Sequence, residues 1–228
     1  ITSNGDRSAD TLFLDGGQAP FNTTDPPTPG FIYLTPRKVE SATANPWFEF
    51  PGSFTVQVWI RPIRVFLGTD IEGGIVGCLV RQVGTQFANI NSGYGLTITS
   101  DSVVHFILTV RRETVSLDVE VAINEWVHLT AWFDTDAREA RLYSSEGTGD
   151  APTMASSYTW PGDGPEPCEF FFHNDLLVGM FQPLYGRNDY FSGYVEELRF
   201  WSRAISEDEM TDAIYRVFAP SPTVLSGI

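Results

Sequence analysis

One carboxylate stands among large apolar residues in the segment YFSGYVEELRFWSRAISEDEM, residues 190–210. From Tyr194 onward the segment alternates like a β-strand, which predicts that Glu196 shares one face with Leu198 and Phe200. An ionised carboxylate in an apolar layer has to be paired, bound to a metal ion or protonated. We therefore expect Glu196 to bind a metal ion or, alternatively, to form a salt bridge with Arg or Lys or to accept backbone N–H bonds.

Two loops combine aromatic and polar side chains in the way that sugar-binding sites do. A sugar needs a flat aromatic ring for its C–H face, and Asp, Asn or Arg for its hydroxyl groups. The alternative is ordinary loop composition, with the aromatic rings folded back on the core. The loops YTWPGDGPEP and QPLYGRNDY supply Trp160 and Asp163, and Tyr185, Arg187, Asn188, Asp189 and Tyr190. Trp59, whose face carries Gln57 and Arg61, is a third candidate, or else it packs under a loop or on the helix after Ser206.

The composition excludes several classes of partner. The formal charge is −15 at pH 7, from 29 Asp and Glu against 14 Lys and Arg. Nucleic acid and anionic lipid both require clustered Lys and Arg, so we expect neither as a partner. Because no stretch approaches the ~18 apolar residues of a membrane helix, we also expect no membrane span.

The pattern along the chain predicts one all-β domain over residues 1–228, with a polar, turn-rich segment at 1–30. Aromatic residues make up 14% of the chain, which also has 20 glycines and 15 prolines, and this favours short strands joined by turns. About eleven strand patterns follow one another, and TDAR separates two of them as a hairpin. The cleanest alternation predicts a core face made of Val115, Leu117, Val119, Val121 and Ile123. The simplest architecture is two packed antiparallel sheets.

One helix is predicted near the C-terminal end. Ser206 is followed by Glu207, Asp208 and Glu209, so Ser206 can cap the helix while Glu209 reaches back in a capping box. The helix is expected to run to about Phe218.

The chain begins at Ile1 without a methionine, so we expect a mature form or an excised domain. It has two cysteines, Cys78 and Cys168. A disulfide between them would close a loop of roughly 90 residues and contribute up to ~4–5 kcal/mol in the chain-entropy model. The alternative, two buried thiols, is the interpretation that we favour.

The order of these segments resembles the laminin G-like and pentraxin branch of the concanavalin A-like jelly rolls. FTVQVWIRP looks like the FTVSFWVKP strand of that family, and NEWVHLTAWFDTDAREARLYSSEG looks like its W-x-H-V-A strand and hairpin. TLFLDGG resembles L-x-F-D-G, LLVGM resembles L-x-I-G, and FSGYVEELRFWSRAISEDEM resembles the closing signature F-x-G-x-I-D-E-V-R-I-Y-N-R-A-L-S-x-x-E. The match runs from roughly residue 10 to residue 212. The chain departs from the family in a longer segment at 18–53.

The resemblance implies a structural calcium ion where the two ends of the domain meet. In many such domains the acid of the closing strand and groups of the F-D-G turn hold the ion, which here implies Asp15, the carbonyl of Gly16, and Glu196. Calcium takes six to eight oxygen ligands and accepts carboxylates, carbonyls and water. Glu196 replaces the Asp of the family and is one methylene longer, which shifts or weakens the expected site.

The fold also hosts glycoside hydrolases, but the residues do not favour catalysis. Their familiar E-x-D-x-x-E spacing does not occur, and the nearest acid pair, Asp118 and Glu120, is predicted on the solvated face of a strand. The three histidines fall on separate predicted strands. We expect a lectin-like, non-catalytic module, secreted or at the cell surface, that binds a glycan or an extracellular protein. A structural or assembly domain and, after it, a polysaccharide-acting hydrolase or lyase are the alternatives. The sequence leaves the oligomeric state open.

Overall fold

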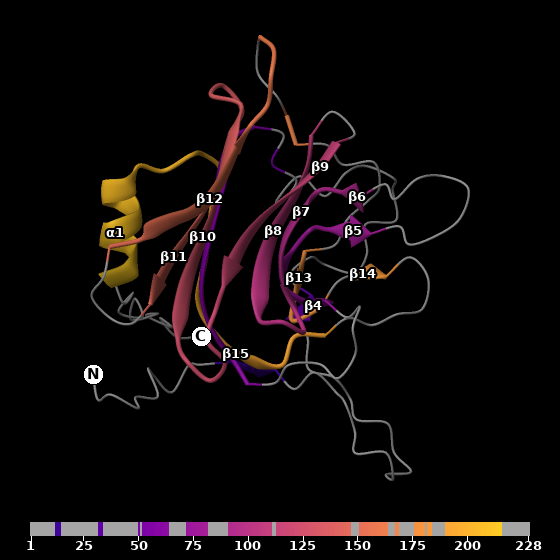
Figure 1. The fold of residues 1–228 in the computed structure, drawn as a ribbon, viewed down its shortest axis with the longest axis vertical. Helices are drawn as coiled ribbons and strands as arrows, with labels where there is room; N and C mark the ends of the chain where they lie inside the picture. The colour runs from indigo at the N-terminus through magenta and orange to yellow at the C-terminus, as the bar shows by residue number, and fades with distance from the viewer. Residues whose placement is uncertain are drawn as a thin grey trace, which may run out of the picture.

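The computed structural model describes residues 12–14, 32–33, 50, 52–63, 72–81, 91–110, 113–146, 151–163, 167–168, 176–180, 182–183 and 190–215. Their strands form two large antiparallel sheets packed face to face (Figure 1). This confirms the predicted all-β sandwich of two antiparallel sheets. That residues 1–228 form one domain stays a prediction.

The two large sheets each contain six strands, and a third, small sheet lies beside the second (Figure 1). The first sheet has the order β1 (Leu12–Leu14), β15 (Gly193–Trp201), β3 (Phe54–Pro62), β10 (Val127–Asp134), β11 (Glu139–Glu146) and β12 (Thr153–Thr159). The second sheet has the order β2 (Ile32–Tyr33), β13 (Leu177–Val178), β4 (Glu72–Gly77), β7 (Tyr94–Thr99), β8 (Val103–Val110) and β9 (Glu113–Glu120). The third contains β14 (Gln182–Pro183), β5 (Val80–Arg81) and β6 (Asn91–Ser92).

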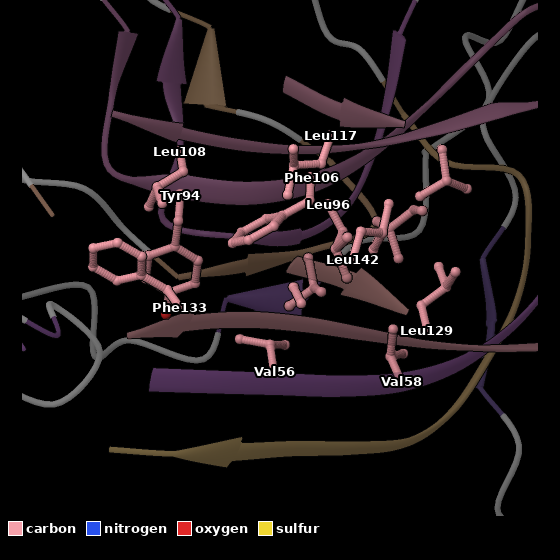
Figure 2. Packing of buried hydrophobic residues seen from close by; sticks show 14 of the residues in the cluster. Val56, Val58, Tyr94, Leu96, Phe106, Leu108, Leu117, Leu129, Phe133 and Leu142 are labelled. Atoms are coloured by element: carbon pink, nitrogen blue, oxygen red, sulfur yellow. The ribbon is translucent and has the colours of Figure 1, made fainter. Parts of the chain in front are cut away.

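The main core lies between the two large sheets. Because side chains alternate along each strand, every second residue points to the opposite sheet. Residues of the predicted core face follow this rule: Val115, Leu117 and Val121 are buried and Val119 is partly buried. Ile123 lies beyond Glu120, where β9 ends, and is half-buried. Figure 2 shows the two inner faces meeting, with Val56, Val58, Leu129, Phe133 and Leu142 opposite Tyr94, Leu96, Phe106, Leu108 and Leu117.

The hairpin predicted at TDAR is present between β10 and β11. Asp134 organises it, because its Oδ1 accepts hydrogen bonds from the backbone N–H groups of Asp136 (2.9 Å) and Ala137 (3.1 Å). Such self-contained bonding to the following backbone is a common role of Asp in turns.

Both cysteines are buried thiols, as we favoured from the sequence. The Sγ atom of Cys78 lies 4.0 Å from the hydroxyl oxygen of Tyr94. Burial, and then the neighbouring Cys78, raise the pKa of Tyr94 well above its ordinary value.

The helix α1 (Glu207–Tyr215) packs on the outer face of the first sheet (Figure 1). Trp132, Tyr143, Ile205 and Met210 form a small second core beneath it. The approach to the helix is fixed by hydrogen bonds, since Trp132 Nε1 donates to the carbonyl of Ile205 (2.9 Å) and Thr55 Oγ1 donates to that of Arg203 (3.0 Å). In the described part of the chain, no helix is long and apolar enough to cross a membrane.

The predicted capping box begins α1. The backbone N–H of Glu209 donates to Ser206 Oγ (3.3 Å), and Glu209 Oε2 accepts from the N–H of Ser206 (3.0 Å). Arg203 adds a bidentate ion pair to the same carboxylate, at 2.6 and 2.8 Å. Beyond Tyr215, the predicted extension to Phe218 lies outside the described residues.

We expect the Glu209 carboxylate to stabilise the protein at neutral pH and to lose this effect in acid. The hydrogen bond from Arg203, then that from the Ser206 backbone, lowers the pKa of Glu209 from 4.5 to about 2. A carboxyl group whose pKa is lower in the folded state stabilises fully above its unfolded pKa, and the stabilisation disappears as pH falls through the folded pKa. Glu209→Gln should therefore lower the melting temperature at pH 7, and the difference from wild type should shrink between pH 4.5 and pH 2. An unchanging difference across that range would contradict the assignment.

Candidate functional site

Glu196 lies on the outer face of the first sheet, and this corrects the prediction that it shares a face with Leu198 and Phe200. A β-bulge interrupts the pairing of β15 with β3 between Glu196 and Arg199, and Glu197 adopts a left-handed backbone with φ of 53°. The extra residue reverses the alternation. Leu198 and Phe200 consequently pack against the main core, whereas Glu196 does not.

Three residues that carry the family-like motifs form one row across neighbouring strands. Glu196 in β15 is opposite Trp59 in β3, and Trp59 is opposite His128 in β10. All three are buried, with Glu196 9% exposed, and the rings of Trp59 and His128 lie 5.1 Å apart. The carboxylate thus belongs to a buried polar layer outside the main core.

The described residues supply only part of the predicted calcium site. No group of three or more His, Cys, Asp and Glu that could hold a metal ion occurs among them. Asp15 and Gly16 lie outside the described ranges. The last described residue of β1, Leu14, is opposite Gly193, which is three residues and therefore about 10 Å along the strand from Glu196. Calcium binding at Glu196 stays a prediction.

The predicted ligand-binding loops are only partly described, and Trp160 is removed from the candidates. Its side chain is 1% exposed, with its ring 5.7 Å from that of Phe133 and 5.0 Å from that of Tyr158. Because a ring in the core offers no face to a sugar, Trp160 serves the fold. Asp163 is exposed.

The other predicted ligand residues belong to the loop before β15. Tyr190 is half-buried and forms isolated bridges with Gly74 and Met180. The remaining four lie outside the described residues: Tyr185, Arg187, Asn188 and Asp189.

Four residues that the sequence did not bring together meet at one end of the outer face of the first sheet. They are Arg61, Asn124, Trp126 and Tyr194, and we call them the Arg61 cluster. The register places Tyr194 opposite Arg61, while Trp126 immediately precedes Val127, the partner of Ile60. Three elements therefore contribute: the end of β3, the turn between β9 and β10, and the start of β15.

Hydrogen bonds hold the polar part of the Arg61 cluster. Arg61 donates from Nε to the backbone carbonyl of Asn124 (3.0 Å) and from Nη2 to its side-chain Oδ1 (2.8 Å). Asn124 has a left-handed backbone with φ of 65°, and its N–H donates to the carbonyl of Pro62 (2.6 Å). The guanidinium group and the turn thus fix each other.

The aromatic part of the cluster is half-exposed. The rings of Trp126 and Tyr194 have their centroids 6.2 Å apart and are inclined at 42°. The guanidinium carbon of Arg61 lies 5.7 Å from the centroid of Tyr194, within the range of a cation–π contact. A pair of aromatic rings beside oriented N–H donors is the combination that a sugar ring needs.

The sequence contained only a partial signal for this cluster. Alternation along β3 puts Arg61 on the face of Trp59, which was a candidate for ligand binding. Trp126 and Tyr194 looked like parts of strand motifs, and Asn124 like an ordinary turn residue. Their meeting depends on the pairing of β15, β3 and β10.

The outer face of the second sheet carries a separate polar group. His105 Nδ1 lies 2.5 Å from Asp118 Oδ1 and 3.1 Å from Ser116 Oγ. Both partners meet the same ring nitrogen, whereas in a catalytic relay the serine and the acid meet opposite nitrogens. Asp118 is 55% exposed and Glu120 is exposed, which confirms the predicted solvated face of this strand.

Comparison with known proteins gives a family match and several fold matches. The family model described as concanavalin A-like lectin/glucanases superfamily matches residues 38–211. No curated protein matches the sequence. Among solved structures, the CBM40 module of the IT-sialidase from Ruminococcus gnavus is 13% identical with a TM-score of 0.52, over 73% of this chain and 84% of the module.

Two further solved structures have similar coverage. The same module bound to α2,3-sialyllactose is 12% identical with a TM-score of 0.51, over 73% of this chain and 84% of the module. A heptameric SAP-like pentraxin from Limulus polyphemus is 16% identical with a TM-score of 0.46, over 74% of this chain and 76% of the pentraxin. At such identities these likenesses concern the fold.

Proposed function

Because the chain belongs to the concanavalin A-like lectin/glucanases superfamily, we propose that it is a non-catalytic carbohydrate-binding module whose ligand contacts the Arg61 cluster. The observation that carries this proposal is the pair of half-exposed rings, Trp126 and Tyr194, beside a guanidinium group that Asn124 holds in place. The rings offer apolar faces to a sugar, and the N–H groups offer donors to its oxygen atoms. We expect the module to act outside the cell or at the cell surface, where glycans are displayed.

Support for this site also comes from its rigidity. Binding costs less when the groups that touch the ligand are already held in place. Arg61 is held by two hydrogen bonds, and both Arg61 and Tyr194 are anchored by the pairing of β3 with β15.

A glycan array tests the proposed function directly. The wild-type protein should bind a subset of glycans, and Trp126→Ala should lose that binding while its melting temperature shows that it is folded. The exposed Met154 is a matched control, because Met154→Ala also truncates a large side chain but lies on β12, away from the cluster. An array with no bound glycan would contradict the proposed function.

Calcium is a separate part of the proposal and involves Glu196 together with Asp15 and Gly16. Glu196 fits as an oxygen ligand in a polar layer, and the remaining ligands would come from outside the described residues. We expect calcium added to EDTA-treated protein to release heat in titration calorimetry and to raise the melting temperature, because a ligand that binds only the folded state stabilises it. Glu196→Gln should abolish both effects. A wild-type protein without heat or thermal shift would remove the site.

A protein-binding or assembly role is the second candidate function, and the edge strand β12 favours it. Its sequence TMASSYT has no charged residue, and Met154 is 50% exposed, the only exposed large hydrophobic residue among those described. Charged side chains on natural edge strands usually prevent pairing with another chain, and the edge strand β9 carries three acidic residues. If the array stays empty while sedimentation shows self-association that Ser157→Lys disrupts, this role replaces the first.

A further inference from the structure

Among the residues that the structure describes, no carboxylate neutralises the charge of Arg61. Its hydrogen bonds go to the neutral carbonyl and amide oxygens of Asn124, and no acid in the described ranges lies within ion-pair distance. Most other described arginines have an acidic partner, even where they are half-exposed. These pairs are Arg141 with Glu139 (2.7 Å), Arg199 with Glu197 (2.7 Å) and Arg203 with Glu209 (2.6 Å).

Among the described arginines, Arg138 also has no acid partner, whereas Arg141, Arg199 and Arg203 each have one. Acids outnumber bases 29 to 14, so a carboxylate is the neighbour that most basic side chains meet. A positive charge held against the ring of Tyr194 and the neutral amide of Asn124 creates a local site for an anion on a protein of net charge −15.

The guanidinium group of Arg61 also has an edge that can bind a carboxylate. Its Nε–H and one N–H of Nη2 are donated to Asn124, which leaves both N–H groups of Nη1 and the second N–H of Nη2. These remaining groups lie along the end of the planar fork, where a carboxylate binds through two parallel hydrogen bonds. The side-chain amide of Asn124 adds a further donor.

We propose that the Arg61 cluster selects sugars that carry a carboxylate, an inference that rests on the proposed carbohydrate-binding function. The carboxylate binds the free edge of Arg61, and the C–H face of the pyranose ring lies on Trp126 and Tyr194. Neutral sugars keep the ring contact and lose the charged one. Glu125, exposed between Asn124 and Trp126, opposes the anion and limits the affinity.

Calorimetry with matched acidic and neutral ligands tests this selection. The probes are 3′-sialyllactose against lactose, and digalacturonic acid against galactobiose. At least one acidic sugar should bind about tenfold or more tightly than its neutral counterpart, as expected for hydrogen bonds to a charged group. The preference should weaken as sodium chloride rises from 50 to 500 mM.

Three variants test whether the preference for acidic sugars depends on the Arg61 cluster. Arg61→Gln should lower the affinity for the acidic sugar about tenfold more than the affinity for the neutral sugar, because only the acidic sugar loses a charged hydrogen bond. Arg203→Gln removes the same charge from a distant ion pair and should change neither affinity. Glu125→Gln should tighten binding of the acidic sugar alone, and this measurement decides the matter if Arg61→Gln does not fold.

The outcomes separate the two levels of the proposal. If glycans bind but acidic and neutral sugars bind equally, or if neither Arg61→Gln nor Glu125→Gln changes their ratio, the selection is overturned and the carbohydrate-binding function stands. If no sugar binds at any concentration tested, the function fails and the selection fails with it.

Discussion

Replacing Phe54 with alanine should lower the melting temperature by roughly 6–20 °C. Removing a buried Phe side chain costs about 3–5 kcal/mol, and each kcal/mol shifts the melting temperature by about 2–4 °C in a domain of this size. Phe54 is 0% exposed and lies at the centre of an aromatic group. Its ring centroid is 4.5 Å from that of Tyr94 and 5.6 Å from those of Phe50 and Phe133.

Thermal unfolding followed by circular dichroism checks this expectation. Met154→Ala is the matched control, since a half-exposed methionine on β12 contributes little to the core, and its effect should stay within about 0.5 kcal/mol. If Phe54→Ala shifted the transition by no more than Met154→Ala does, the aromatic group would not be the centre of the core.

Gly77→Ala should be still more damaging, because it forces two backbones apart. A Cβ atom on Gly77 would lie 2.5 Å from the Cα of Gly95 and 2.5 Å from the carbonyl oxygen of Tyr94. Neither contact can be relieved by turning a side chain, since both atoms belong to the backbone of β7. Gly77 also has φ of 155°, which residues with a side chain rarely adopt. We expect a loss of about 4 kcal/mol or more and little soluble protein.

Gly52 provides the comparison for this prediction. No atom lies within 4 Å of a Cβ built on Gly52, so Gly52→Ala should leave the melting temperature unchanged or raise it slightly. Soluble yield and urea unfolding of the two variants measure the difference. Equal stability of Gly77→Ala and Gly52→Ala would mean that β4 and β7 can separate without cost.

Local patterns were sufficient to predict much of the fold. The alternation around Leu117, the turn at Asp134 and the capping box at Ser206 each depend on residues close together in the sequence, and all three are present. These features follow from backbone periodicity and from short side chains that bond to their own backbone.

The site was predicted less well because it depends on pairing between distant strands. The β-bulge that turns Glu196 to the outer face lies where β15 pairs with β3. The alternation of residues 194–201 does not predict this bulge. Trp160 follows a strand and precedes a proline and a glycine, a typical loop pattern, yet its ring is buried in the core. Arg61 and Asn124 are 63 residues apart, and only the folded chain brings them together.

The additional residue in β15 makes the length of this strand a stricter constraint than its composition. Deleting Glu197 would remove the β-bulge and restore a regular alternation of side chains along β15. Either Val195 or the pair Leu198 and Phe200 would then point away from the core. Point substitutions at Glu197 should leave the fold intact. Insertions or deletions of one residue in β15 should be absent from a variant library that has been selected for folded protein. Changes in the length of this strand should therefore be rare among functional variants, even at positions where amino-acid substitutions are tolerated.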